Sequence, residues 1–128
     1  MRTLLLIVCL SAACGDSELT ELPLESAVSV GAVEFAGDHW TALQPGAQIW
    51  LELDAPEGMQ FDFVELEHTP AGAAPARVTV GLQSWTTHWA RARLELDEPM
   101  RVGADKPLVS WSSAAAGDTL RAVRVALY

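Results

Sequence analysis

Hydrophobic and polar residues alternate along most of the chain, in short runs separated by Gly- and Pro-containing turns. Side chains of a strand point alternately to its two faces, so such runs predict half-buried β-strands. We expect strands at residues 27–35, 47–54, 60–67, 77–85, 88–96, 108–112 and 119–127. A helix is supported nowhere, except for one possible turn near residues 112–116. The pattern predicts an all-β fold, a single antiparallel, jelly-roll-like sandwich of about seven or eight strands.

The first fourteen residues follow a different pattern. Arg2 precedes a continuous apolar run at residues 4–10, and the small residues Ser11, Ala12 and Ala13 then lead to Cys14. A positive start, a short apolar run and small residues are typical of a secretory signal. The apolar run is too short to span a bilayer, which needs about 20 apolar residues.

The end of this signal, Leu-Ser-Ala-Ala-Cys, resembles the lipobox of bacterial lipoproteins, although Ser11 stands where that family usually has an aliphatic residue. The resemblance implies cleavage before Cys14, acylation of its thiol, and attachment to a membrane of the cell envelope. In a host with two membranes, Gly15 in the second mature position favours the outer membrane. Cys9 would be removed with the signal, so no thiol would remain for a disulfide.

These features divide the chain into three parts. Residues 1–13 are expected to be the signal peptide, and residues 14–26 a lipidated cysteine with an acidic tether. Residues 15–26 contain four acidic side chains and no basic one, which favours an extended segment. Leu19, Leu22 and Leu24 alternate with acids there and leave room for a docking strand. Residues 27–128 are expected to form the sandwich.

Composition excludes some classes of partner. The 128 residues include 17 acidic and 8 basic ones, with a net charge of −9 and a single lysine, Lys106. A nucleic-acid-binding protein needs basic side chains to displace counterions from phosphates, so nucleic acid is not expected as a partner. His39, His68 and His88 lie far apart in the sequence, and no spacing typical of a zinc site occurs. We expect no metal, no cofactor and no enzymatic activity, because nucleophile-elbow and phosphate-loop motifs are also missing.

Tryptophans carry the most specific hint of binding. In the expected strands, Trp50, Trp85 and Trp89 fall on the polar side of the alternation, the latter together with Arg91 and Arg93. Such flat aromatic rings beside polar side chains suit sugar rings, and Trp and Arg also anchor protein interfaces. The alternative is that these tryptophans cover the edges of the sandwich, because one β-bulge reverses the faces. Trp40 and Trp111 could not be assigned to a face.

The last strand adds a second resemblance. Residues 117–128, with the sequence Gly-Asp-Thr-Leu-Arg-Ala-Val-Arg-Val-Ala-Leu-Tyr, resemble the final strand of galactose-binding-type jelly rolls. Three hypotheses follow for function. The main one is a lipid-anchored, non-catalytic envelope lipoprotein that acts as a structural or binding module, with an envelope protein as a possible partner. The alternative is a carbohydrate-binding sandwich that uses the exposed tryptophans, and the third is a small hydrolase.

Overall fold

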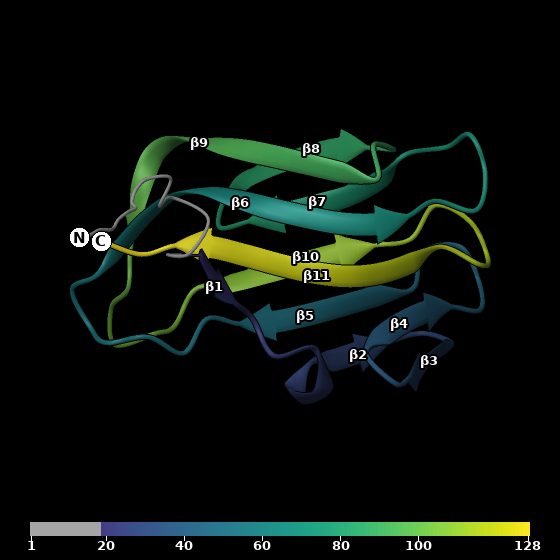
Figure 1. Cartoon of the computed structure of the whole chain (residues 1–128), viewed down its shortest axis with the longest axis horizontal. Coiled ribbons are helices and arrows are strands. Elements are labelled where there is room, and N and C mark those ends of the chain that lie inside the picture. The colour runs from purple at the N-terminus through teal and green to yellow at the C-terminus, as the bar shows by residue number, and fades with distance from the viewer. Residues whose placement is uncertain (1–18) are drawn as a thin grey trace, which may run out of the picture.

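In the computed structural model, which describes residues 19–128, two antiparallel sheets pack face to face (Figure 1). One sheet has the order β3-β4-β11-β6-β9, and β1 pairs with the remaining part of β11. Its strands are β3 (Val33–Ala36), β4 (His39–Ala42), β11 (Thr119–Ala126), β6 (Gln60–Thr69), β9 (Arg91–Arg101) and β1 (Leu19–Glu21). We call it the six-stranded sheet.

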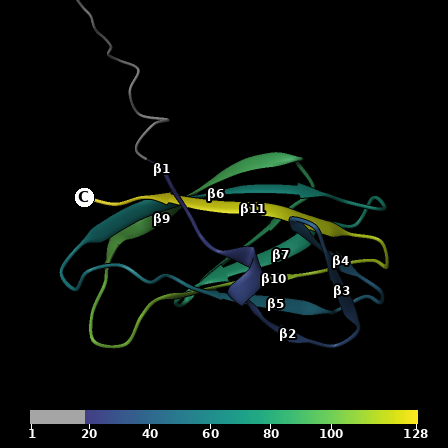
Figure 2. The ribbon, with the colours of Figure 1, turned by 60° about the horizontal axis from the view of Figure 1, so that its bottom comes forward.

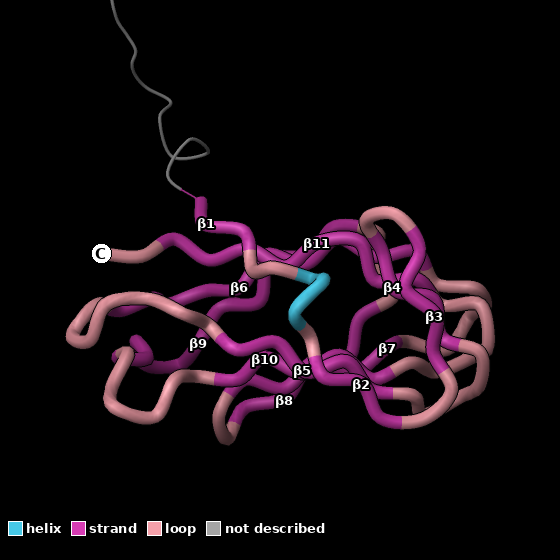
Figure 3. The backbone as a smooth tube through the Cα atoms, turned by 90° about the horizontal axis from the view of Figure 1, so that it is seen from below, coloured by secondary structure: helices cyan, strands magenta, loops and turns pink. Residues whose placement is uncertain are grey.

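The second, five-stranded sheet has the order β2-β5-β10-β7-β8. Its strands are β2 (Val28–Val30), β5 (Gln48–Glu52), β10 (Leu108–Ser112), β7 (Ala76–Val80) and β8 (Gln83–Thr87). Figure 2 shows the sheets as two layers, and Figure 3 shows the short 3₁₀ helix η1 (Leu24–Ser26) passing between them. The predicted all-β sandwich is therefore confirmed.

The core lies between the layers and is built by the alternation seen in the sequence. Trp111 and Ile49 from the five-stranded sheet and Phe61, Leu66 and Leu120 from the six-stranded sheet are all fully buried. Complete burial of a side chain of this size contributes roughly 1.5–3 kcal/mol. This shared core fixes which side chains of every strand face outward, and so determines the two outer surfaces of the molecule.

Residues 19–26, the described part of the expected tether, pack against the sandwich. Leu19 pairs with Ala126 and Glu21 with Arg124, while Leu22 and Leu24 are buried in the core. The apolar side chains between the acids thus dock this segment onto the sandwich, as the docking strand for which their alternation left room. Cys14, the predicted lipidation site, lies outside the described residues.

Two expected strands are each divided into two. The 27–35 run changes sheet at Gly31, whose φ of +91° suits glycine. The 77–85 run is a hairpin in which Val80 pairs with Gln83 across a two-residue turn at Gly81 and Leu82. The possible helical turn at residues 112–116 is not formed, because Ser112 ends β10 and residues 114–117 form bends and a turn. With β1 and β4 added, the described part of the chain has eleven strands.

Candidate functional site

The structure separates the predicted binding residues. Trp50 lies on the outer face of the five-stranded sheet, because its neighbours Ile49 and Leu51 point into the core. Arg91 and Arg93 are exposed on β9, on the outer face of the opposite sheet. Trp89 lies in the β8–β9 connection and is 69% exposed. The five residues therefore do not form one site.

The expectation that Trp85 faces outward is wrong. Trp85 pairs with Val78, which is fully buried, and its half-buried ring packs against the core. The cause is the turn at Gly81 and Leu82, which begins a new strand and reverses the alternation. Leu82, expected to point inward, is fully exposed at this turn.

Trp40 and Trp111, which the sequence left unassigned, belong to the interior. The Trp40 indole packs partly buried against the core, and its Nε1–H donates to the Leu24 carbonyl at 2.8 Å. Trp111 is completely buried in the middle of the five-stranded sheet. Trp50 and Trp89 are thus the tryptophans whose rings are available for a ligand.

Around Trp50, two rows of outward side chains run across the five-stranded sheet, and we call these rows the Trp50 face. Cross-strand pairing places Trp50 between Val28 and Ser110, and continues the row to Thr79 and Ser84. The second row consists of Val30, Gln48, Ser112, Arg77 and Thr86. Four of the five strands thus place a hydroxyl, amide or indole group on one surface.

Hydrogen bonds hold part of this face in place. The Nε1–H of Trp50 donates to Oε1 of Gln48 at 2.9 Å, which orients the partly exposed indole along its own strand. This bond uses the amide oxygen of Gln48, whose NH₂ group carries two donors of its own. Thr79 and Ser84 bring their hydroxyl oxygens within 3.0 Å of each other. Each hydroxyl both donates and accepts, so the pair can bind another hydroxyl group.

One end of the Trp50 face is apolar and hollowed. A groove of about 420 Å³ is lined by Trp50, Val28, Val30 and Leu108, with Ser26 and Glu52 at its margin. Val28 is 64% exposed and Leu108 is 44% exposed, so both aliphatic side chains that line this groove are open to solvent. The groove can therefore accept the apolar part of a ligand. The face therefore combines an aromatic and aliphatic end with a hydroxyl-rich end.

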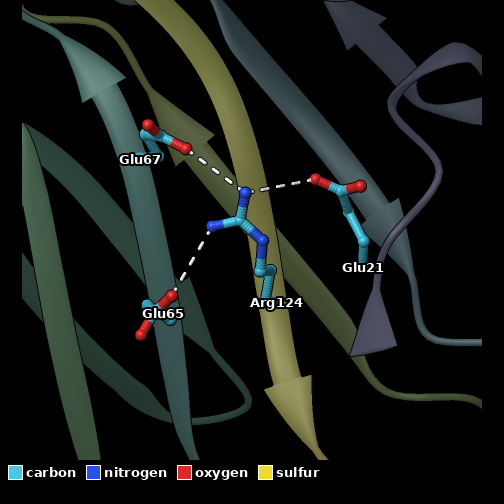
Figure 4. Close-up of polar contacts among 4 residues, drawn as sticks. All are labelled: Glu21, Glu65, Glu67 and Arg124. Carbon is cyan, nitrogen blue, oxygen red and sulfur yellow. Dashed lines mark hydrogen bonds and ion pairs between the residues drawn. The ribbon is translucent and has the colours of Figure 1, made fainter. Parts of the chain in front are cut away.

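The outer face of the six-stranded sheet is charged instead. Figure 4 shows Arg124 of β11 between Glu65 and Glu67 of β6 and Glu21 of β1, at 3.5, 3.3 and 3.5 Å. On β9, the guanidinium of Arg93 lies 3.7 Å from the Phe63 ring centre and 3.3 Å from Glu95. A groove of about 590 Å³ is lined by Glu21, Glu65, Arg93 and Arg124, together with Leu19, Arg91 and Ala92. The described arginines Arg93 and Arg124 therefore face carboxylates on this surface, and the Arg124–Glu21 pair links β11 to β1.

The loop end of the sandwich is organised by buried polar groups. The carboxylate of Asp118, 1% exposed, accepts backbone N–H groups from Ala71 at 2.7 Å, Ala114 at 2.8 Å and Ala115 at 3.0 Å. His68 is equally buried, and its Nδ1 lies 3.5 Å from the indole nitrogen of Trp111. Burial lowers the pKa of His68, while the Trp89 backbone and the Asp118 carboxylate oppose part of this shift. These groups are structural.

Residues 19–128, the part of the chain that the structure describes, also bear on metal binding and on membrane crossing. This part of the chain contains no cluster of three or more histidine, cysteine or acidic side chains that could hold a metal ion. Across the same residues, no helix has the length and apolar character that crossing a membrane requires.

The architecture is a jelly-roll β-sandwich, the class of fold shared by carbohydrate-binding modules. Similar solved structures include the family 35 carbohydrate-binding module from Clostridium thermocellum, with a TM-score of 0.55 and 13% identity over 84% of this chain and 96% of that one. The xylan-binding module CBM86 from Roseburia intestinalis has a TM-score of 0.59 and 13% identity over 86% and 96%.

A larger enzyme is similar over part of its length. The GH26-CBM35 β-(1,4)-mannanase of Podospora anserina has a TM-score of 0.61 and 9% identity, and the match covers 87% of this chain. This chain spans 28% of that enzyme. No protein-family model matches the sequence, and no curated protein has a detectably similar one.

Proposed function

We propose that this protein is a non-catalytic carbohydrate-binding module whose Trp50 face binds a glycan. The observation that carries the proposal is the partly exposed Trp50 ring, set in a row of hydroxyl groups on the outer face of the sheet. The jelly-roll fold shared with carbohydrate-binding modules supports it. This favours the carbohydrate-binding alternative of the sequence analysis over a purely structural role.

The chemistry of the face matches that of a sugar. The C–H groups on one side of a pyranose ring pack against the electron-rich face of an indole, while its hydroxyl groups need donors and acceptors around the rim. Trp50 and the neighbouring Val28 and Leu108 supply the apolar platform. Gln48, which accepts the indole N–H, supplies an amide group, and Ser110, 8% exposed, lies at the neighbouring position of the row.

The row across the strands is long enough for more than one sugar unit. Neighbouring strands lie about 4.8 Å apart, so Thr79 lies roughly 10 Å and Ser84 roughly 14 Å from Trp50 across the sheet. We therefore expect an oligosaccharide to lie across the strands, with one ring on Trp50 and later units at the Thr79–Ser84 hydroxyl pair. Affinity should rise with the length of the oligosaccharide until this pair is reached.

Titration of the protein against a panel of polysaccharides and oligosaccharides tests the proposal, with binding followed by calorimetry. We expect at least one glycan to bind, and Trp50→Ala to reduce its affinity at least tenfold while the far-UV spectrum stays unchanged. Trp89→Ala is the matched control, because this exposed tryptophan lies outside the Trp50 face. The affinity of the Trp89→Ala variant for the glycan should stay within twofold of wild type. Equal losses in both variants, or none in either, would contradict the assignment of the site.

We also propose that the module is attached to the cell envelope by lipid on Cys14. The lipobox-like motif at residues 10–14 supports acylation of this cysteine. Two or three acyl chains would hold the protein stably at the membrane, whereas a single chain binds reversibly. Expressed in a bacterial host, the full-length chain should fractionate with membranes, and Cys14→Ser should release it. A wild-type chain found in the soluble fraction would refute the anchor, while the glycan titration would be unaffected.

A further inference from the structure

We infer that the glycan bound on the Trp50 face is uncharged, and that the protein discriminates against polysaccharides rich in carboxylate groups. This inference rests on the proposed function and adds the class of ligand. It follows from where the described charges lie relative to the two outer faces of the sandwich.

The Trp50 face is almost free of charge. Of the ten side chains in its two rows, Arg77 is the one ionised group, and it lies in the second row between Ser112 and Thr86. The row that contains Trp50 is made of neutral side chains throughout. Arg77 lies two strands away from Trp50, so a carboxylate on the sugar at Trp50 would lose water and gain no neighbouring cation in return, which costs free energy.

Acidic residues border the apolar end of the face. Glu52 lines the groove beside Trp50, and the exposed Asp54 follows it after one residue. The Nζ of Lys106 donates to the Asp54 carboxylate, so the cation at this end is already engaged. A carboxylated sugar on Trp50 would therefore meet a like charge on Glu52. A neutral sugar would meet an acceptor for its hydroxyl groups.

Most of the described arginines lie elsewhere and already have polar partners. Arg93 and Arg124 are on the outer face of the six-stranded sheet, where they pair with glutamates. Arg121 donates to the Thr69 hydroxyl, and Arg101 to the Gly58 carbonyl. The protein thus offers a polyanion no cluster of unpaired cations on the Trp50 face.

The charge of the whole chain acts in the same direction. A net charge of −9 on 128 residues repels a polyanion as it approaches. Salt weakens this repulsion, because the Debye screening length is about 10 Å at an ionic strength of 0.1 M. Binding of a neutral glycan, in contrast, has no long-range charge component and should depend little on salt.

Affinity electrophoresis at 0.05 and 0.5 M NaCl tests the inference, with gels that contain galactomannan, xylan or mixed-linkage β-glucan as neutral probes and polygalacturonate or alginate as acidic probes. We expect a neutral probe to retard the wild-type protein, with an affinity that changes less than twofold between the two salt concentrations. Trp50→Ala should abolish the retardation, and the acidic probes should retard neither protein.

A gain-of-charge variant sharpens the test. Ser84→Lys places a cation in the row of Trp50, and we expect it to gain retardation by polygalacturonate that disappears at 0.5 M NaCl. Ala73→Lys adds the same charge in an exposed loop at the end of the sandwich and should gain none.

The possible failures are distinguishable. If an acidic probe binds the wild type more tightly than every neutral one, and Trp50→Ala abolishes this binding, the ligand class is wrong and the site is right. If Ala73→Lys gains as much acidic binding as Ser84→Lys, local charge on the face is not what excludes carboxylates. If no probe binds, or neutral binding survives in Trp50→Ala, the proposed function itself fails, and the inference fails with it.

Discussion

Asp118 is the side chain on which the loop end of the sandwich depends most. Its buried carboxylate accepts three backbone N–H groups, one from the loop that contains Ala71 and two from the loop that contains Ala114 and Ala115. The first loop connects β6 to β7 and the second connects β10 to β11, so each crosses between the two sheets. The Asp118 side chain joins these two connections. We expect Asp118→Ala to destabilise the whole domain, because both connections lose their common acceptor.

The size of the loss can be worked out from these contacts. Hydrogen bonds to charged groups contribute about 1.5–3 kcal/mol each, so three of them set an upper range of roughly 4.5–9 kcal/mol. Ala71 is exposed, and Ala114 and Ala115 are half-buried, so water can reach the freed N–H groups. We therefore expect a net loss of stability of about 3 kcal/mol, which is below the lower end of that range. In a domain of this size, this lowers Tm by roughly 12–24 °C.

Thermal and urea unfolding, followed by circular dichroism, measure this loss. Asp118→Asn keeps one acceptor oxygen and should lie between wild type and Asp118→Ala. Asp105→Asn removes the same charge from an exposed loop and should stay within about 0.5 kcal/mol of wild type. A loss below about 1 kcal/mol for Asp118→Ala would show that the three hydrogen bonds do not hold the loops.

Three further predictions concern stability measured by urea unfolding. Burial lowers the pKa of His68, so protons bind the unfolded chain more readily, and stability should fall as the pH drops below about 6.5. His68→Gln should flatten this slope, and an unchanged slope would refute the assignment. Arg124→Met should cost about 1–2 kcal/mol, since its carboxylate partners are partly exposed. A cost that did not shrink in 1 M NaCl would contradict an ionic origin. Gly81→Ala should cost about 1 kcal/mol or more, because φ is +61° and the added Cβ would lie 2.6 Å from Cε of Met100. A neutral result would show that this turn relaxes freely.

The fold was predictable wherever alternation and turn residues agree. Residues 108–112 form β10 as expected, because Val109 and Trp111 are both buried and the strand has a partner on each side. The strand β4, His39–Ala42, shows no alternation, and its burial comes from its place between β3 and β11. Such strands depend on contacts distant in sequence, so a local pattern does not reveal them.

The hairpin of β7 and β8 shows how a small error spreads. Leu82 looks like a core residue by its position in the run, yet it occupies the exposed tip of a two-residue turn. Moving the turn to this point reverses the faces of the rest of that run, including Trp85. The signal in the sequence that could have located the turn was Gly81, because two-residue hairpin turns favour glycine. In the structure its φ is indeed positive.

The candidate site was predictable one strand at a time and no further. Alternation correctly placed Trp50 on the outer side of β5. It could not show that Ser110 and then Thr79 continue the row from Trp50, because the crossed order of the sheet places β10 next to β5 and β7 next to β10. For the same reason it grouped Trp50 with Arg91 and Arg93, which the sandwich places on its opposite surface.

The most direct test of the account is the NMR spectrum of the indole N–H groups during titration with the oligosaccharide that binds best. The five tryptophans have different environments, since the N–H of Trp50 donates to Gln48 and that of Trp40 donates to Leu24, while Trp89 is highly exposed. The account predicts that the Trp50 signal shifts with the ligand in a saturable way while the Trp89 signal stays in place. A saturable shift of Trp89 with Trp50 unchanged would contradict it.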